Sequence, residues 1–497
     1  MKCVLPICEK PSVITSIHHA YPCAIIESKN VLDMDIIDYG KYVWENKRNN
    51  AELIVDNSNI RLFENEMGED VSCVIWRKCS DNDEMIIRIN YVKVFDFSRF
   101  VDVFLFDDLE EELDKEDKTE GIRWNPYGYF IQKDMYSFDT RQYMYIKVKK
   151  NDNKLFTFAS KDGTKWEAIA EALQENDGQR KYIGVHIYLG SDDFDSWKAM
   201  NYVQLVYNSK NLYKGIHLDY YLFPRKNVDN SYMGYSSFLD TKYDYLFEVL
   251  DCYGSLHNFI TKSINHRYYV VICLDEYYVK DRPSFQKKNY NHYNMIYGYN
   301  DEERRYYLMG YGRGNIPVIS SVSYDDLCIE NVTSEFITRY RYNTSDVIKY
   351  RFDKKVLCNE IQEYICDINS ASQISRTITE EELIWGISII ENLYTDDSLR
   401  RDIRDDIRIS FCLQEHSKLM KERINFLYKH EYINTVEFDR LINKVEDIIH
   451  LATLGIAQVL KCLTGKNNKD NLDIYLKEYY VKEKYLCQNL LDALLAS

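Results

Sequence analysis

The hydrophobic pattern of this chain changes its period along the sequence. From about residue 50 to residue 207, apolar and polar residues alternate in short runs, for example over 83–89, 142–148 and 155–160. Beyond about residue 330, apolar residues recur at the spacing of an amphipathic helix. Alternation is typical of half-buried strands, and the longer spacing is typical of helices that pack on one face. We therefore expect a β-rich N-terminal half and a helical C-terminal third, in an α+β chain.

The β-rich half contains a recognisable turn between two of its strands. Ser160, Asp162, Gly163 and Trp166 form the pattern SxDGxxW, and an Asp-Gly pair is favoured in tight hairpin turns. A further strand is expected over 182–190, with the sequence YIGVHIYLG. This pattern resembles the concanavalin-like, laminin-G-type jelly rolls of many bacterial proteins. We expect an antiparallel β-sandwich that packs against or recognises a partner, because no cluster of aromatic residues or metal ligands points to sugar binding.

Local sequence patterns predict the remaining loops, strands and helices. The acidic stretch 107–120 is expected to be a solvated loop, and a helix is expected over 243–264, before a strand over 268–274. Towards the C-terminus four helices are expected. They run from a capping box at Thr379 and Glu382 to about Leu393, from about Asp402 to Leu427, from Asn434 and Glu437 to about Leu463, and over 470–495.

Charge and cysteine content limit where the protein works and what it binds. The net charge is −16 and no basic stripe is present, which argues against a nucleic-acid partner. No run of about 18 apolar residues and no signal-peptide core are found, so we expect neither a membrane span nor secretion. The 13 cysteines lack the paired spacing of a zinc site, and many lie in apolar runs. We expect a cytoplasmic protein with free thiols, no metal and no cofactor.

Two residues are candidates for chemistry. His292 opens an apolar run, and a turn and a second strand over 305–311 follow it. A hairpin of this kind holds a His rigidly toward a nucleophile on another element. Near the N-terminus, Cys23 follows Pro22, and Pro is favoured in the first turn of a helix. If a helix begins there, its dipole favours the thiolate form of Cys23.

A family resemblance connects these two residues. The segments 268–277 and 292–300, together with 18–27 and 416–423, resemble the butirosin-biosynthesis acyltransferase family and related papain-like domains. The resemblance implies a papain-like α/β core interrupted by the jelly roll. The expected domains are the Cys-bearing segment of the core (1–30), the inserted β-sandwich (31–207), the remainder of the core (208–345) and a helical bundle (346–497).

The resemblance also implies a function. An acyl group would pass from a carrier-protein thioester to a small-molecule amine through an acyl-cysteine intermediate, in secondary-metabolite biosynthesis. Cys23 would be the nucleophile and His292 its base, and either Asn300 or Asp301 would orient the imidazole unless both are only turn residues. Because carrier proteins are usually acidic, docking requires basic side chains, and the bundle offers Lys418, Lys421 and Arg423.

The sequence departs from the family pattern at two places. Bacteriocin-processing cysteine peptidases, which are similar in a more distant way, carry a Gln shortly before the Cys, where this chain has Ile17 and His18. They also follow the second strand with Asp-Pro, where this chain has Met309 and Gly310. The oxyanion donor and third catalytic residue therefore stay open, with His18 or His19 as donor candidates.

Alternatives to this reading remain. Cys252 is a rival nucleophile, although its apolar neighbours favour a buried thiol. The same Cys–His pair could serve a peptidase or hydrolase with water as the acceptor. A third reading is a non-catalytic binding or scaffold protein, in which the core is degenerate and the jelly roll is the working surface.

Overall fold

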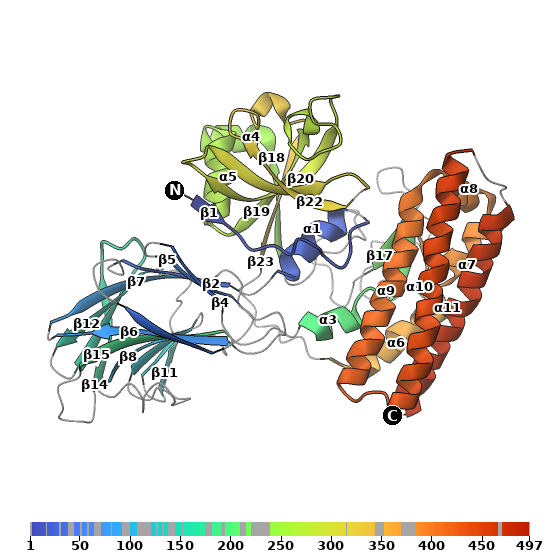
Figure 1. Cartoon of the computed structure of the whole chain (residues 1–497). Coiled ribbons are helices and arrows are strands. Elements are labelled where there is room, and N and C mark those ends of the chain that lie inside the picture. The colour runs from blue at the N-terminus through green and yellow to red at the C-terminus, as the bar shows by residue number, and fades with distance from the viewer. Residues whose placement is uncertain are drawn as a thin grey trace.

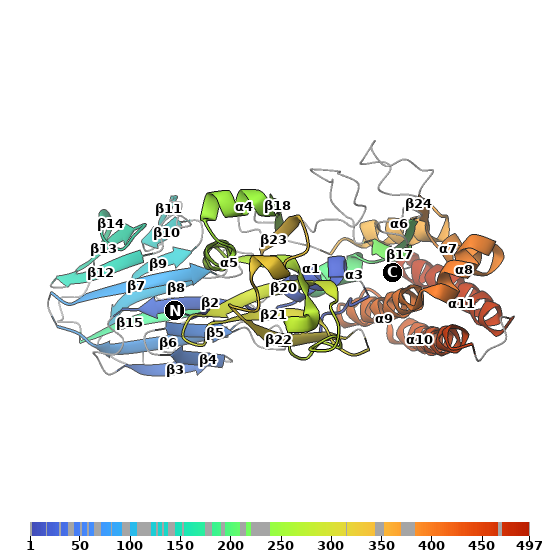
Figure 2. The ribbon, with the colours of Figure 1, turned by 90° about the horizontal axis from the view of Figure 1, so that it is seen from above.

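The computed structural model places the chain in three lobes, a β-sandwich, a central sheet with its helices, and a helical bundle (Figures 1 and 2). The structure describes residues 2–15, 17–28, 31–37, 44–49, 52–56, 59–63, 71–80, 82–91, 100–106, 121–125, 128–131, 134–137, 145–151, 154–173, 181–189, 194–208, 215–219, 239–314, 316–342, 352–368, 383–465 and 470–496. All the strand pairs described here are antiparallel, so the fold is a mixed α+β arrangement.

The sandwich consists of two sheets that face each other. One has the order β11-β10-β9-β8-β15-β6-β3 and the other the order β14-β13-β12-β7-β2-β5-β4. The first comprises β3 (Glu45–Asn49), β6 (Val71–Lys78), β8 (Phe100–Phe106), β9 (Gly121–Asn125), β10 (Gly128–Ile131), β11 (Asp134–Ser137) and β15 (Tyr182–Leu189). The second comprises β2 (Val31–Ile36), β4 (Glu52–Asp56), β5 (Asn59–Phe63), β7 (Glu84–Tyr91), β12 (Tyr145–Asn151), β13 (Lys154–Ser160) and β14 (Glu167–Leu173). Alternate residues of both sheets, such as Val185 and Val148, share one apolar core, as the period of two predicted.

The predicted Asp-Gly turn joins β13 to β14. The carboxylate of Asp162 accepts hydrogen bonds from the backbone N–H groups of Thr164 and Lys165. Gly163 has a φ of 78°, a conformation that Gly adopts readily. The acidic stretch 107–120 lies outside the described residues.

The central lobe is a sheet in the order β18-β23-β19-β20-β21-β22, and β1 also pairs with β20. Its elements are β1 (Lys2–Val4), α1 (Ile17–Ile26), β18 (Leu239–Tyr245), α4 (Leu246–Tyr253), α5 (Leu256–Asn265), β19 (Tyr268–Asp275), β20 (Asn291–Asn300), β21 (Arg305–Tyr311), β22 (Pro317–Ser323) and β23 (Phe336–Tyr342). Cys3 of β1 lies opposite Tyr299 of β20, so the first residues of the chain share a sheet with the segment after the sandwich.

The helix expected over 243–264 is shorter and interrupted. Residues up to Tyr245 are extended because β18 pairs with β23. Gly254 then ends α4 with a φ of 72°, and the side chain of Ser255 caps α5 by accepting from the N–H of Asn258.

The third lobe combines a small sheet with the helical bundle. Its sheet has the order β17-β16-β24. Its elements are α3 (Phe194–Met200), β16 (Gln204–Asn208), β17 (Gly215–Asp219), α6 (Lys354–Ile365), β24 (Leu383–Trp385), α7 (Ser388–Thr395), α8 (Asp397–Asp405), α9 (Ile407–Lys429), α10 (Thr435–Leu463) and α11 (Asp470–Ala496). Residues 194–208, expected in the sandwich, and 215–219, expected in the core, instead belong to this lobe, because β16 pairs with both β17 and β24.

The helices predicted for the C-terminal third are partly confirmed. Asn434 caps α10 by accepting from the N–H of Glu437, as predicted. The helix expected from Asp402 to Leu427 is divided, because Asp406 caps α9 and separates it from α8. Thr379 and Glu382 lie outside the described residues. In the helix expected from them to about Leu393, Leu383–Trp385 form β24 instead, and the second half is helical as α7. In the part of the chain that the structure describes, no helix is long and apolar enough to cross a membrane.

Candidate functional site

His292 lies near the start of β20, where its imidazole faces a buried carboxylate. Nδ1 of His292 is 3.4 Å from Oε1 of Glu276. The side chain of Glu276 is 3% exposed, whereas that of His292 is 27% exposed. Because Glu276 lies beside Nδ1, the tautomer with the proton on Nδ1 is favoured, and this leaves Nε2 as a base. An imidazole that is oriented by a carboxylate and open to solvent is the arrangement of a general base.

Two buried side chains hold Glu276 in place. Its Oε1 is 3.6 Å from Nε of Arg282 and 3.5 Å from Nδ2 of Asn294. Nη2 of Arg282 donates to Oδ1 of Asn294 over 2.9 Å. Burial lowers the pKa of Arg282, and the charge of Glu276 opposes that shift. The carboxylate therefore has a charged and a neutral partner inside the protein, which fixes its orientation toward His292.

Aromatic rings surround the imidazole on two sides. The ring of Tyr290 stacks on His292 with centroids 5.8 Å apart, and the ring of Tyr311 meets it edge-on at the same distance. The hydroxyl of Tyr311 donates to the carbonyl of Ile14, in the segment that precedes α1. Tyr21 of α1 donates its hydroxyl to the carbonyl of Tyr293 over 2.7 Å. Thus α1 approaches the His292 strand through Tyr21.

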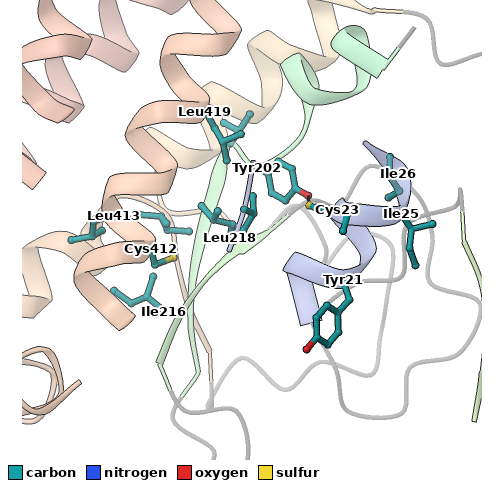
Figure 3. Packing of buried hydrophobic residues seen from close by; sticks show 14 of the residues in the cluster. Tyr21, Cys23, Ile25, Ile26, Tyr202, Ile216, Leu218, Cys412, Leu413 and Leu419 are labelled. Carbon is teal, nitrogen blue, oxygen red and sulfur yellow. Dashed lines mark hydrogen bonds between the residues drawn. The ribbon is translucent and has the colours of Figure 1, made fainter. Parts of the chain in front are cut away.

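Cys23 lies on α1 but in a different environment. The helix begins at Ile17, so Pro22 is inside it and Cys23 is about two turns from its N-terminus. The prediction that a helix opens at Pro22 is therefore wrong, and the N-terminal dipole does not act on this thiol, because that effect fades within the first turn. Cys23 is 1% exposed, and its Sγ is 2.8 Å from the hydroxyl of Tyr202 (Figure 3). Burial raises the pKa of the Cys23 thiol well above its usual range, and the neighbouring Glu27 raises it further.

The contacts that the described residues make do not join Cys23 to His292. Successive residues of a helix are about 100° apart, so Tyr21 and Cys23 point in nearly opposite directions. Figure 3 shows Tyr21 on one side of α1 and Cys23 on the other, beside Tyr202. Tyr21 bonds to the strand of His292, and Cys23 lies on the opposite side of α1 from Tyr21. Among the described residues, His292 has ring and charge contacts with Glu276, Tyr290 and Tyr311, not with Cys23.

Asn300 does not orient His292. The two residues lie at opposite ends of β20, and eight residues of extended chain span roughly 26 Å. Oδ1 of Asn300 instead accepts from the N–H groups of Glu302 and Glu303, as a turn residue does. Asp301 belongs to the same turn and accepts from the hydroxyl of Tyr324. Asn300 and Asp301 are therefore turn residues, as the alternative stated. The side chain placed to orient the His292 imidazole is that of Glu276.

The structure also places the rival nucleophile Cys252, the docking candidate Arg423 and the oxyanion-donor candidate His19. Cys252 is an exposed thiol on α4 rather than a buried one. Arg423 is not part of a docking surface, because it is fully buried and donates to the carbonyls of Ala199 and Asn201. His19 is 2% exposed within α1, and the side chain of His18 lies outside what the structure describes.

Sequence reasoning missed Glu276. The available signal was the pair Asp275 and Glu276 at the end of a fully apolar strand that directly precedes the His292 strand. In an antiparallel hairpin, the end of one strand lies beside the start of the next, so a carboxylate at that position is close to a His at the start of β20. The candidates for orienting the imidazole that the sequence suggested, Asn300 and Asp301, lie at the far end of β20 from Glu276.

Comparison with known proteins finds few similarities. No protein-family model and no curated protein matches the chain. Among solved structures, the exoplasmic/lumenal domain of VIP36 in a Ca2+/Man2-bound form is similar to 30% of this chain, and the match covers 74% of that domain. The identity is 14% and the TM-score 0.23, so this likeness supports no conclusion about function. Within the described ranges, no group of three or more His, Cys, Asp or Glu side chains could hold a metal ion.

Proposed function

We propose that this protein is an acyltransferase in which His292 acts as the general base, paired with Glu276. The observation that carries the proposal is the contact between the part-exposed imidazole and the buried carboxylate. The donor is an acyl thioester on a carrier protein, and the acceptor is a small-molecule amine. Both identities come from the resemblance of 268–277 and 292–300 to the butirosin-biosynthesis acyltransferases, and they are part of the proposal.

The reaction needs no acyl-cysteine intermediate. Nε2 of His292 removes a proton from the amine as the nitrogen attacks the thioester carbonyl. The tetrahedral intermediate then expels the thiolate, which takes the proton back from the imidazolium. The products are an amide and a free thiol, and His292 returns to its starting tautomer. Glu276 stabilises the imidazolium while it exists, as the carboxylate of a catalytic triad does.

We assign His292 as the base without a cysteine nucleophile because of the environment of Cys23. A reactive cysteine needs an accessible thiolate, whereas the Cys23 thiol is buried and its pKa is raised. The acyl-cysteine route would require Cys23 to leave Tyr202 and turn to the other face of α1. The acyl-cysteine route is therefore the alternative hypothesis, and substitution of Cys23 tests it.

We further propose that the sandwich is a concanavalin-like jelly roll that recognises a partner, and that the protein works in the cytoplasm. The two facing antiparallel sheets support the first point. The presence of all thirteen cysteines as free thiols supports the second, because reducing compartments preserve free thiols.

Three variants test the proposed chemistry. The assay follows thiol release from a butyryl-loaded acyl carrier protein with ethanolamine as the acceptor, and mass spectrometry identifies the product. His292→Ala is expected to lower the rate about 100-fold or more, because general-base catalysis contributes factors of this size. Glu276→Gln is expected to lower it about 10-fold or more, because the amide no longer stabilises the imidazolium.

Cys23→Ala is the matched control. It is expected to leave the rate within about twofold of the wild type, because the thiol lies away from His292. An acyl adduct that disappears in this variant, together with lost activity, would restore the acyl-cysteine route. Release of butyrate without amide would identify a hydrolase. An inactive wild-type protein would contradict the catalytic proposal and leave the scaffold reading.

A further inference from the structure

One peptide group in the segment that precedes α1 contacts both the central sheet and the helical bundle. Figures 1 and 2 show α1 between these two lobes. The peptide group joins Ile14 to Thr15, and its carbonyl oxygen accepts from the hydroxyl of Tyr311 on β21 over 2.7 Å. Its N–H donates to Oε2 of Glu415 on α9 over 3.3 Å. Both bonds therefore act on one planar unit, which is rigid between its C=O and its N–H.

Glu415 binds this segment with both of its carboxylate oxygens. Oε1 accepts from the N–H of Ile14 over 2.7 Å, and Oε2 accepts from the hydroxyl of Thr15 as well as from its N–H. Glu415 is only 5% exposed. Because all three partners are donors, the ionised carboxylate satisfies each of them. A protonated carboxyl presents its own O–H beside these donors and accepts from them less well.

Tyr311 connects this peptide group to His292. The ring of Tyr311 meets the imidazole edge-on, with centroids 5.8 Å apart. Since the hydroxyl of Tyr311 is bonded to Ile14, the position of the ring depends on the peptide group that Glu415 holds. Burial raises the pKa of the Tyr311 phenol, and the charge of Glu415 raises it further. The carboxylate and the phenol therefore also interact through space.

We propose that Glu415 is a positioning residue for the His292 site, and that its ionised carboxylate holds Tyr311 beside the imidazole through the peptide group of Ile14 and Thr15. This inference rests on the proposed function and places a control of that site in another lobe. Hydrogen bonds in a chain polarise one another, so the charge on Glu415 strengthens the bond that Tyr311 makes at the other end of the peptide group.

The ionisation of Glu415 falls near neutral pH. Burial raises the pKa of Glu415 to about 7, and its bonds to Thr15 and Ile14 oppose that shift. Near pH 7 the buried thiols and the phenol around it stay neutral, because burial raises the pKa of each. The titratable and charged side chains that face the carboxyl are Cys23 from α1, Tyr311 from β21, and Cys412 and Lys418 from α9 itself.

Replacement of Glu415 by Gln tests the inference, because Gln has the shape of a protonated Glu and cannot ionise. Glu415→Gln is compared with Glu422→Gln, the same change at a part-exposed position of α9, where Glu422 pairs with Lys198. Each protein is assayed between pH 5.5 and 8.5 with ethanolamine and butyryl-N-acetylcysteamine, a thioester without a carrier. The measured quantity is the ratio of the wild-type kcat/KM to that of the variant, because an effect of pH on the chemistry common to both proteins cancels in it.

For Glu415→Gln the ratio is expected to rise from about 1 at pH 5.5 to about 5 at pH 8.5, with its midpoint near pH 7. The ratio for Glu422→Gln should stay at about 1 throughout. A ratio for Glu415→Gln that is the same at every pH, whatever its size, would overturn the inference while leaving the His292 chemistry intact. A wild-type protein without turnover at any pH would instead overturn the proposed function.

A double-mutant cycle tests the link without an assay of activity. Tyr311→Phe removes one bond to the shared peptide group, and Glu415→Gln weakens the other. The midpoints of guanidinium unfolding at pH 8 are compared for the wild type, the two single variants and the double variant. The fall in the double variant is expected to be smaller than the sum of the single falls, because residues that share a partner are coupled. Falls that simply add would overturn the inference.

Discussion

At the scale of single residues, Gly310 permits the arrangement that supports His292. A Cβ atom at this position would overlap Oδ1 of Asn294 and lie 2.5 Å from Nη2 of Arg282. These two side chains hold Glu276, so a methyl group at residue 310 would push apart the partners of the carboxylate. The packing at this position therefore requires the absence of a side chain.

Gly310→Ala is expected to destabilise the protein by about 1–3 kcal/mol, because it overpacks a buried polar contact. It is also expected to lower the activity that depends on His292. Gly455→Ala is the control, since a Cβ there meets nothing within 4 Å. That change is expected to stabilise α10 by about 0.5–1 kcal/mol, the difference between Gly and Ala within a helix. Thermal melts measure both, and equal melting temperatures for Gly310→Ala and the wild type would contradict the prediction.

At the scale of elements, a buried polar pair joins α9 to α11. His416 donates from Nε2 to the carbonyl of Val203 over 2.9 Å, and its Nδ1 is 3.4 Å from Oε1 of Glu483. Burial lowers the pKa of His416 to about 4 and raises the pKa of Glu483 to about 7. Near neutral pH the folded protein therefore holds a neutral His416 imidazole beside a protonated Glu483 carboxyl, which faces Nδ1 of the imidazole. The charged and titratable side chains around the pair are Arg423, Cys487, Tyr364 and Tyr479.

Glu483 and His416 are expected to change the stability of the bundle in opposite directions as the pH rises. Glu483 binds its proton more tightly in the folded state, so stability is lost as the pH passes from its unfolded pKa to about 7, by up to about 3 kcal/mol. His416 acts in the opposite direction and costs stability below about pH 6.5. The two effects therefore largely cancel between about pH 5 and 6.5 in the wild type, and the difference between wild type and variant reports Glu483 alone. Glu483→Gln is expected to reduce the alkaline loss, because the amide donates to Nδ1 without ionising.

Guanidinium unfolding, followed by the helical circular-dichroism signal at pH 5.5, 7 and 8.5, checks this. Glu415→Gln is a useful comparison, because burial also raises the pKa of Glu415 to about 7 and this group binds the backbone of Ile14 instead. A pH slope that is the same in Glu483→Gln and the wild type would show that the pair does not titrate as expected.

At the scale of the whole molecule, thiol exposure reports how the lobes are packed. Cys252 and Cys366 are exposed, on α4 and just after α6, and are expected to react with iodoacetamide in the native protein. Cys23, Cys412 and Cys487 are buried and are expected to react only after unfolding, because the reagent needs an accessible thiolate. Peptide mass spectrometry after timed labelling measures this. Rapid native labelling of Cys23 would mean that α1 opens, and it would support a cysteine nucleophile.

The sequence by itself determined the local structure. The alternation of apolar residues indicated the strands of the sandwich, and the Asp162 turn and the Asn434 cap appear as predicted. These features depend on residues within a few positions of one another, which a single sequence contains. His292 also appears near the start of a strand, as its apolar run indicated.

The tertiary structure decided which side chains meet. The helix around Cys23 begins at Ile17, and this start sets the phase that turns Tyr21 toward β20 and Cys23 toward Tyr202. Hairpin pairing of β19 with β20 places Glu276 beside His292, and pairing of β16 with β24 joins segments about 180 residues apart. Helix phase and strand partners depend on packing across the molecule, so the pattern around each residue could not specify them.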